Sequence, residues 1–465
     1  MPSRGSRLAL VAVSCVAVRA ILWLGYGPLF GHDTYIYQDI ALQFRNWDFS
    51  LYCGIRPPVF PAFLLLTGLD YTWLVLAQQA LGALSAVFLF DAARRLTGSV
   101  WLALISAIGS GLALNLVLVE FCAVPEALSS FLVVCSFWLL VRIRDAPRGA
   151  AVFCLLLGLA MALAGLARPN LFVLIPVYAV CLVLPRLRKA TRKVAVMRLA
   201  AYAVPCALLI LGWCAFNQRQ IGCFTPTTAT GYHLTQHAGA FMEDAPAEFA
   251  TVREVYLKHR ERFIAGSGSH AGTIWRAFPE MQEKTGLSFA QLSSELTRLS
   301  LRLCVRHPVR YLMSVASSWA HFWTAPAMWS PPDAAPWLAA ALKRLLALQR
   351  PLWIAVNAAF LGLAALTIGP ALVRRRPIFA DSRLICLFSV VLSASVFQAL
   401  AEVGENGKFS LPFQPLVILA VLIGCRELAG RLREPPAGRS RWSRLFPLGP
   451  AAVGDGPAGA RTGAD

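Results

Sequence analysis

The segment between residues 29 and 70 is rich in side chains that can take part in polar chemistry. Its carboxylates, aromatic rings and guanidinium are Asp33, Asp39, Asp48, Tyr35, Tyr37, Trp47 and Arg56. The segment directly follows an apolar run, so we expect Asp33 to lie at a membrane surface, just outside the lipid. These residue types favour a polar site there. The alternative is an ordinary solvated loop.

Polar side chains also open apolar runs elsewhere in the chain. Glu126 follows a proline, and Arg168 precedes one. Either side chain alone can be explained by snorkelling to water. Both are expected in the same compartment as Asp33, however, and this predicts a shared polar site.

A third polar turn precedes the last apolar run and contains Glu402, Glu405 and Lys408. A lone cation on the outer side of a membrane can hold a phosphate near the lipid headgroups. The alternative is an Asn-Gly turn whose charges are solvated.

The composition indicates which kind of structure has to position these residues. Of the 465 residues, 57% are hydrophobic and 14% are charged, whereas soluble domains carry about 25% charged residues. Lipid must therefore be the solvent for much of the chain. The net charge of +19 comes from short basic clusters between apolar runs. That distribution is typical of membrane topology rather than of nucleic-acid binding.

Ten apolar runs are long enough to cross a membrane as helices. They are predicted near 8–28, 71–91, 100–119, 126–143, 150–167, 170–185, 199–217, 351–372, 383–402 and 409–427. The basic clusters between them all lie on one side, which the positive-inside rule makes the cytoplasmic side. Both termini are then expected in the cytoplasm. The first run is expected to stay as an anchor, because no small-residue cleavage site follows it.

The sequence predicts an all-α polytopic membrane protein with four parts. They are an N-terminal transmembrane module (1–217) with the first outside loop at 29–70, an extracytoplasmic segment (218–350), C-terminal transmembrane helices (351–431) and a disordered cytoplasmic tail (432–465). Residues 57–69 predict a short helix that folds the first loop back over the spans. Residues 308–328 and 336–350 predict either interfacial helices or a further pair of spans.

Several familiar catalytic patterns are absent from the sequence. It has no phosphate-binding glycine loop, no nucleophile elbow and no Cys or His arrangement typical of a metal site. An extracytoplasmic site has no nucleotide pool, so an activated substrate would have to arrive by lipid. We expect no cofactor, and the sequence leaves dependence on a divalent metal open. Arg19, inside the first span, either faces the helix bundle or snorkels.

The order and spacing of the polar motifs resemble those of the family C glycosyltransferases, polytopic enzymes that use polyprenyl-phosphate-linked sugars. The similarity is greatest to the branch that contains the protein O-mannosyltransferases and the aminoarabinose transferase acting on lipid A. It runs from the first span to about residue 430. The matching residues are Asp33, Arg56-Pro57-Pro58-Val59-Phe60-Pro61, Gln78-Gln79-Ala80-Leu81-Gly82, Pro125-Glu126, Arg168-Pro169 and Lys408-Phe409-Ser410-Leu411-Pro412.

The resemblance implies a glycosyltransferase that acts on the extracytoplasmic side. Asp33 would be the general base that deprotonates an acceptor hydroxyl, and displacement of polyprenyl phosphate would invert the anomeric carbon. Lys408, Arg168 and Arg56 would contact the leaving phosphate. The other implied substrate-binding residues are His32, Tyr35, Tyr37, Glu126 and Glu405.

The implied partners are the lipid-linked donor, the bilayer and a cell-envelope acceptor, which is a glycan, a lipid or a protein. No nucleic acid is expected, and the expected location is a bacterial plasma membrane. Segment 218–350 would hold the acceptor or cover the site. Two departures from the family pattern are Thr34, where protein O-mannosyltransferases carry Glu, and Lys408-Phe409, where Arg-Tyr is usual. The first puts a protein acceptor in doubt. The second keeps the charge but loses the bidentate fork.

Two other interpretations compete with a glycosyltransferase of this kind. A transporter or flippase of lipid-linked sugars would handle the same lipid, but it often shows inverted repeats and broken helices, which the sequence lacks. An enzyme like the O-antigen ligases would also use lipid-linked donors. Ligases place their important residues in a late loop, whereas the loop of Asp33 follows the first span.

Overall fold

The computed structural model describes most of the chain. The described residues are 4–145, 149–183, 192–267, 269–324, 326–374, 382–404 and 406–433. Within these ranges the regular structure is helical, apart from two isolated β-bridges. The predicted all-α fold is therefore confirmed. The predicted disordered tail lies almost wholly outside the described residues.

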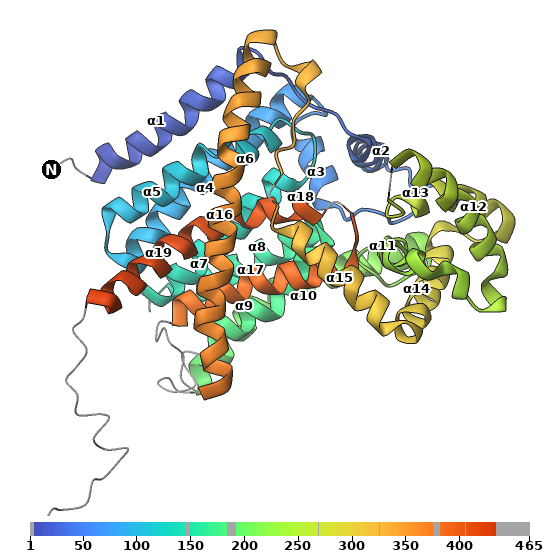
Figure 1. Ribbon diagram of the computed structural model, residues 1–465. Helices are drawn as coiled ribbons and strands as arrows, with labels where there is room; N and C mark the ends of the chain where they lie inside the picture. Colours follow the sequence, from blue (N-terminus) through green and yellow to red (C-terminus); the bar gives the residue numbers. More distant parts are fainter. Residues whose placement is uncertain are drawn as a thin grey trace, which may run out of the picture.

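Apolar helices form a bundle (Figure 1). Seven helical runs in the described ranges are long and apolar enough to cross a membrane: α4 (Tyr71–Thr97), α7 (Glu126–Asp145), α8 (Ala150–Ala167), α10 (Arg192–Ile221), α16 (Pro336–Arg374), α17 (Ser382–Ala401) and the run of α18 (Asn406–Ser410), η5 (Leu411–Phe413) and α19 (Gln414–Arg433). Shorter apolar helices are α1 (Arg4–Trp23), α5 (Val100–Gly111) and α9 (Leu174–Val183), which follows the 3-10 turn η1 (Pro169–Val173). These helices coincide with the ten predicted spans.

One predicted span is broken in two. The run at 100–119 forms α5 and then α6 (Leu114–Val119). In an unbroken helix, the carbonyl of Gly111 would accept a hydrogen bond from the backbone four residues further on. It accepts instead from Nη1 of Arg19 at 3.1 Å, so the side chain of another helix replaces the backbone partner where α5 ends.

The first predicted outside loop folds into two helices, α2 (His32–Asn46) and α3 (Val59–Leu66). Tyr37 of α2 packs edge-on against Phe60 of α3, with ring centroids 4.9 Å apart. The helix α3 lies within the stretch predicted at 57–69 and packs against both α2 and α8. The loop is therefore folded back over the bundle, as the sequence predicted.

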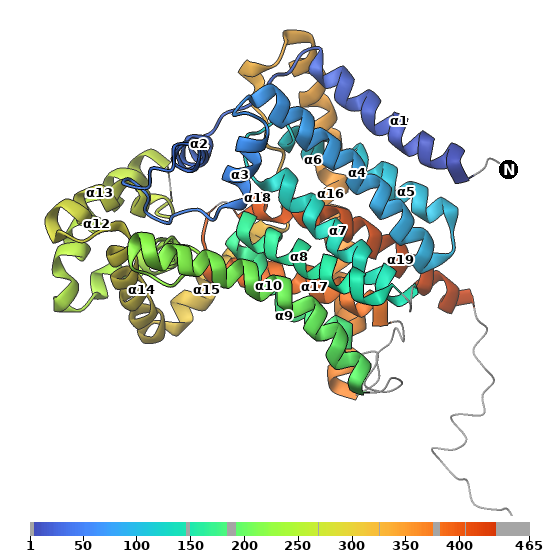
Figure 2. The ribbon, with the colours of Figure 1, turned by 180° about the vertical axis from the view of Figure 1, so that it is seen from behind.

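Helices α11 to α14 form a unit to one side of the bundle (Figures 1 and 2), which we call the lateral domain. It contains α11 (Thr230–Ala238), η2 (Gly239–Asp244), η3 (Ala247–Phe249), α12 (Ala250–Ser267), α13 (Thr273–Thr285) and α14 (Phe289–Arg306). Its core is separate from that of the bundle. Tyr232 lies at its centre and stacks on Phe289, with ring centroids 4.2 Å apart.

The stretch 308–350 is largely helical, and whether its helices lie at the membrane interface stays a prediction. Its first part is α15 (Pro308–Phe322), which packs on α17, where the indole N–H of Trp319 donates to the hydroxyl of Ser395 at 3.1 Å. After the turn η4 (Pro331–Asp333), residues 336–350 are the beginning of α16 and continue into its apolar part. Leu338 near the start of α16 is buried beside α1. The helix α16 runs without a break through residue 350, the expected boundary between two parts of the chain.

Candidate active site

A short parallel contact between two connections fixes the start of α2. The N–H of Leu29 donates to the carbonyl of Phe121 at 2.8 Å, and the carbonyl of Leu29 accepts from the N–H of Ala123 at 3.0 Å. The hydroxyl of Thr34, in the first turn of α2, donates to the carbonyl of Ala123 at 3.1 Å. Asp33 is thereby held next to the segment that leads into α7.

These contacts give a structural reason for the threonine after Asp33. Thr34 is fully buried, and its hydroxyl oxygen accepts from the N–H of Gly31 at 3.0 Å. A glutamate here would place a carboxylate in the same buried position, at a cost in desolvation. The departure from the protein O-mannosyltransferase pattern therefore stabilises the start of α2.

The Gln78-Gln79 pair of α4 supports the same segment. The side-chain amide of Gln78 donates to the carbonyls of Glu120 and Cys122 at 2.8 and 2.9 Å. The side-chain carbonyl of Gln79 accepts from the indole N–H of Trp23 at 2.6 Å. Gln78 therefore positions the connection between α6 and α7, and Gln79 connects α4 to α1.

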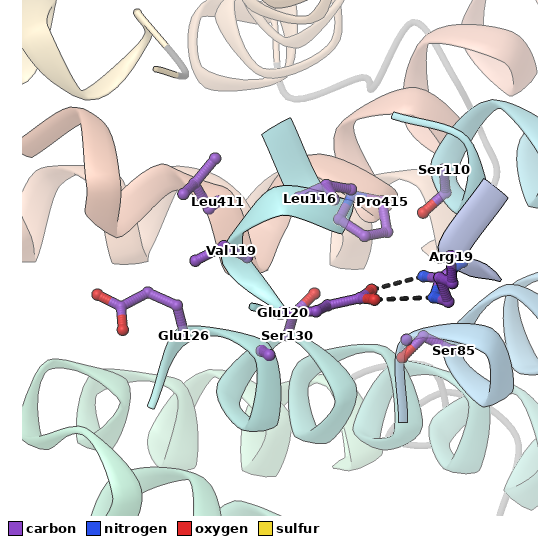
Figure 3. Close-up of a pocket in the computed structure, with 12 residues that line it drawn as sticks. Arg19, Ser85, Ser110, Leu116, Val119, Glu120, Glu126, Ser130, Leu411 and Pro415 are labelled. Atoms are coloured by element: carbon purple, nitrogen blue, oxygen red, sulfur yellow. Dashed lines mark hydrogen bonds and ion pairs between the residues drawn. The ribbon is translucent and has the colours of Figure 1, made fainter. Parts of the chain in front are cut away.

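Arg19 faces the bundle and pairs with Glu120 (Figure 3). Nε and Nη2 of Arg19 donate to the two carboxylate oxygens at 2.8 and 2.5 Å, and Nη1 donates to the carbonyls of Cys15 and Gly111 at 3.0 and 3.1 Å. A Cβ added at Gly82 would collide with the Glu120 carboxylate, so the glycine of this motif makes room for the pair. We call Arg19 and Glu120 the buried pair.

Five of the predicted site residues meet in a second group, which we call the charge cluster: Asp33, Arg56, Glu126, Arg168 and Lys408. Oδ1 of Asp33 lies 2.7 Å from Nη2 of Arg56, and Oδ2 lies 3.4 Å from Nζ of Lys408. Oε1 of Glu126 lies 3.0 Å from Nη1 of Arg168 and 3.9 Å from Nζ of Lys408. Lys408 therefore links the ion pair of Asp33 and Arg56 to that of Glu126 and Arg168. The cluster brings together residues from five separate parts of the chain.

Two aromatic rings lie under the arginines of the charge cluster. The guanidinium of Arg168 lies over the ring of Phe409, 4.2 Å from its centroid, and that of Arg56 lies 5.6 Å from the centroid of Tyr37. Such contacts stabilise a cation without neutralising its charge. Phe409, which stands where the family usually has a tyrosine, therefore helps to orient a cation.

The other predicted substrate-binding residues do not all lie at the charge cluster. Tyr37 is buried beside the charge cluster, whereas Tyr35 is 57% exposed. The cation–π contact therefore places Tyr37, but not Tyr35, against the cluster. The side chain of His32 and the whole of Glu405 lie outside the described part of the chain.

The charge cluster contains buried polar atoms that make no hydrogen bond to the residues that the structure describes. They are both carboxylate oxygens of Glu126, Nη1 of Arg168 and Nε of Arg56, of which Oε1 of Glu126 and Nη1 of Arg168 face each other in the 3.0 Å ion pair. Buried polar atoms in folded proteins nearly always have a hydrogen-bond partner, so each exception needs an explanation. A bound polar ligand would supply partners for several of them at once.

The electrostatic surroundings keep Asp33 ionised. Burial alone would raise the pKa of Asp33, but the charges of Arg56, Lys408 and Arg168 together hold it well below its usual range. Asp33 also lies in the first turn of α2, where the helix dipole favours a negative charge. It is a strong partner for cations here and a weak base.

Two residues that were not assigned to the site from the sequence stand beside the charge cluster. Oε2 of Glu402 lies 3.4 Å from Nδ1 of His233 in α11 and accepts from Nε2 of Gln398 at 3.0 Å. Burial opposes ionisation of Glu402, but His233, Gln398 and Lys408 lower its pKa to about 2. Glu402 had a signal in the sequence, because it precedes Lys408 in one turn. His233 had none, because it comes from another domain.

A small cavity lies between the buried pair and Glu126. It is lined by Arg19, Ser85, Ser110, Glu120, Glu126 and Ser130 among others. Figure 3 shows that the carboxylate of Glu126 points away from the buried pair. Among the described residues, no three His, Cys, Asp or Glu side chains are grouped closely enough to hold a metal ion.

No family model matches the sequence, and no curated protein matches it. In structure, the chain is similar to the oligosaccharyltransferase AglB of Archaeoglobus fulgidus in complex with an inhibitory peptide and a dolichol-phosphate. The TM-score is 0.50 at 13% identity, over 96% of this chain and 52% of that one. The apo form of an oligosaccharyltransferase from the same organism gives a TM-score of 0.49 at 14% identity, over 96% and 52% of the two chains.

This chain thus spans about half the length of the proteins that it resembles. The likeness to AglB, which has the family C glycosyltransferase fold, confirms the fold that the motifs predicted. This similarity concerns the fold alone and does not identify a branch within the family.

Proposed function

We propose that this protein is a membrane glycosyltransferase that moves a sugar from a polyprenyl-phosphate-linked donor to an acceptor hydroxyl. The observation that carries the proposal is the charge cluster itself, in which three cations and two carboxylates from distant segments meet on a family C fold. Cations suit a lipid-linked phosphate, and a carboxylate suits an acceptor hydroxyl.

In this proposal, Arg56, Arg168 and Lys408 bind the donor phosphate. Nε of Arg56 is buried and makes no hydrogen bond to the described residues, so it retains a donor for a phosphate oxygen. Donors that are already in position stabilise the charge that develops on a leaving group. Side chains thus supply the positive charge, and adding or removing EDTA tests whether a divalent ion contributes as well.

Binding of the donor would turn Asp33 from an ion-pair partner into a base. Arg56 and Lys408 hold Asp33 ionised, and a phosphate competes with it for both cations. When Arg56 and Lys408 bind the phosphate instead, the affinity of the Asp33 carboxylate for a proton rises. Donor binding therefore makes Asp33 a stronger base.

The transfer itself is a single displacement. Asp33 takes the proton of the acceptor hydroxyl, and the acceptor oxygen forms a bond with the anomeric carbon. The bond between that carbon and the phosphate oxygen breaks, and polyprenyl phosphate leaves with the electron pair. Attack from the face opposite the leaving group inverts the anomeric configuration.

We assign the charge cluster to the extracytoplasmic side of a bacterial plasma membrane, with both termini in the cytoplasm. Support comes from the opposite end of the bundle, where Arg95 pairs with Asp145 and Arg426 donates to the carbonyl of Thr97. Arginines at one end of a bundle mark the cytoplasmic side. A reporter inserted at residue 240, in the lateral domain, should respond as extracytoplasmic. A cytoplasmic response would reverse the assignment.

The direct test is transfer of radiolabelled sugar from polyprenyl phosphate by the full-length protein in membrane vesicles. Label should move to a new product with the wild type, and Asp33→Asn should lower the rate by about 10²- to 10⁴-fold. Asp39→Asn is the matched control, because Asp39 is an exposed carboxylate on the same helix. If the wild type transferred no sugar from any such lipid but moved the lipid between leaflets, the protein would be a transporter.

A further inference from the structure

The pair of His233 and Glu402 brings the lateral domain to the edge of the charge cluster. Nδ1 of His233 in α11 lies 3.4 Å from Oε2 of Glu402, and the two side chains are 24% and 13% exposed. Glu402 also lies within electrostatic reach of Arg56 and Lys408. The pair is therefore part of the same polar region and accessible to a ligand.

The start of α11 is fixed against the segment that carries Arg56. The hydroxyl of Thr227 donates to the carbonyl of Ile55 at 2.9 Å, and the hydroxyl of Thr228 donates to the carbonyl of Cys53 at 2.8 Å. Arg56 follows this segment directly. The same contacts therefore position a proposed donor-binding cation and the histidine.

His233 has hydrogen-bonding capacity that the protein does not use. Its Nδ1 is buried and faces the Glu402 carboxylate at 3.4 Å, and its Nε2 forms no hydrogen bond with the described residues. A carboxylate beside Nδ1 favours the tautomer with a proton on that nitrogen, which leaves Nε2 as an acceptor. Nε2 and the Glu402 carboxylate both accept hydrogen bonds from hydroxyl groups.

The charge balance argues against an anionic acceptor. The cations Arg56, Arg168 and Lys408 are opposed by two carboxylates within the charge cluster, with Glu402 beside them. Once these cations hold the donor phosphate, a second phosphate or carboxylate would add negative charge without a partner, which is costly in a buried site. A neutral, hydroxyl-rich ligand avoids that cost.

We propose that His233 and Glu402 form the acceptor subsite and bind hydroxyl groups of a neutral glycan. This inference rests on the proposed glycosyltransferase activity. Glu402 orients the imidazole, and Nε2 of His233 accepts a hydrogen bond from one sugar hydroxyl while the reacting hydroxyl faces Asp33. The bundle then holds the donor, and the lateral domain selects the acceptor.

The test separates the two substrates. Polyprenyl-phosphate binding and the rate of transfer to methyl hexopyranosides, used as acceptor probes, are measured with the full-length protein. His233→Ala should raise the acceptor KM about tenfold, which is the effect of losing a hydrogen bond, and should leave the Kd of polyprenyl phosphate unchanged. His233→Gln should recover part of the acceptor KM, because its amide can still bond to a hydroxyl.

His259→Ala is the matched control. His259 forms a similar pair, 2.8 Å from Glu280, elsewhere in the lateral domain, and its loss should change neither constant. The proposal is overturned if His233→Ala leaves the acceptor KM unchanged or weakens donor binding equally. It also fails if the wild type glycosylates a membrane acceptor but no hexopyranoside. Failure of the proposed function itself would be distinct, because the wild type would then not bind polyprenyl phosphate.

Discussion

The buried pair and the charge cluster are built from the same kinds of side chain but differ in how completely these are bonded. Nε, Nη1 and Nη2 of Arg19 all donate hydrogen bonds, and both carboxylate oxygens of Glu120 accept. In the charge cluster, both oxygens of Glu126 and atoms of Arg56 and Arg168 are buried without hydrogen bonds to the described residues. A fully bonded pair stabilises the fold, whereas an incompletely bonded cluster retains capacity for a ligand.

Breaking the buried pair should have the largest effect on stability. Glu120→Ala leaves Arg19 unpaired inside the bundle, which costs about 3–5 kcal/mol. Thermal unfolding of the detergent-solubilised protein should therefore shift to a much lower temperature. The double variant Arg19→Leu with Glu120→Leu should recover most of the stability, because it buries no charge.

Glu126→Gln is the matched control for this prediction. It replaces the carboxylate by an amide of the same size, whose oxygen can still accept from Arg168, so thermal stability should stay nearer that of the wild type than in Glu120→Ala. Transfer should nevertheless fall about 100-fold, because Arg168 and Lys408 lose their common partner and are misplaced. If Glu120→Ala and Glu126→Gln destabilised the protein equally, the distinction between the two regions would be wrong.

Removing a cation from the charge cluster should have an intermediate effect, on binding rather than on stability. Lys408→Ala should weaken the binding of polyprenyl phosphate about tenfold, which is the loss of one charge-assisted hydrogen bond. Lys408→Arg keeps the charge and should bind nearly as well as the wild type. Unchanged affinity in Lys408→Ala, measured by equilibrium titration, would remove this side chain from the phosphate site.

The smallest expected effect concerns Glu402 and pH. Its pKa in the folded protein is lowered from 4.5 to about 2, so its ionic contribution to stability is present above pH 4.5 and is lost as the pH falls toward 2. Wild type should therefore be more stable than Glu402→Gln near neutral pH, and the difference should shrink in acid. A difference in melting temperature that did not change between pH 7 and pH 3 would contradict the ionic role.

The spans and the folded first loop could be predicted because hydropathy and charge bias are properties of short segments. The break at Gly111 could not, because it depends on a hydrogen bond from Arg19 in another helix. The burial of Leu338, at the start of α16, beside α1 could not be predicted either. Contacts between distant segments leave no local pattern.

The same limit applies to the candidate site. The residue types and the common side of Asp33, Glu126 and Arg168 could be predicted, and the structure brings them together. The pairing of each acidic side chain with a particular basic one could not be predicted, because it depends on how several helices pack together. His233 belongs to a separate domain and shares no motif with the cluster, so only its contact with Glu402 identifies it.

The central claim is that the charge cluster holds a lipid-linked phosphate in competition with Asp33. The most direct test is the equilibrium binding of polyprenyl phosphate to the wild type and to Asp33→Asn. Because the variant removes the competing carboxylate from Arg56 and Lys408, it should bind the lipid about two- to fivefold more tightly, although it transfers sugar far more slowly. Weaker or unchanged binding by Asp33→Asn would contradict the claim.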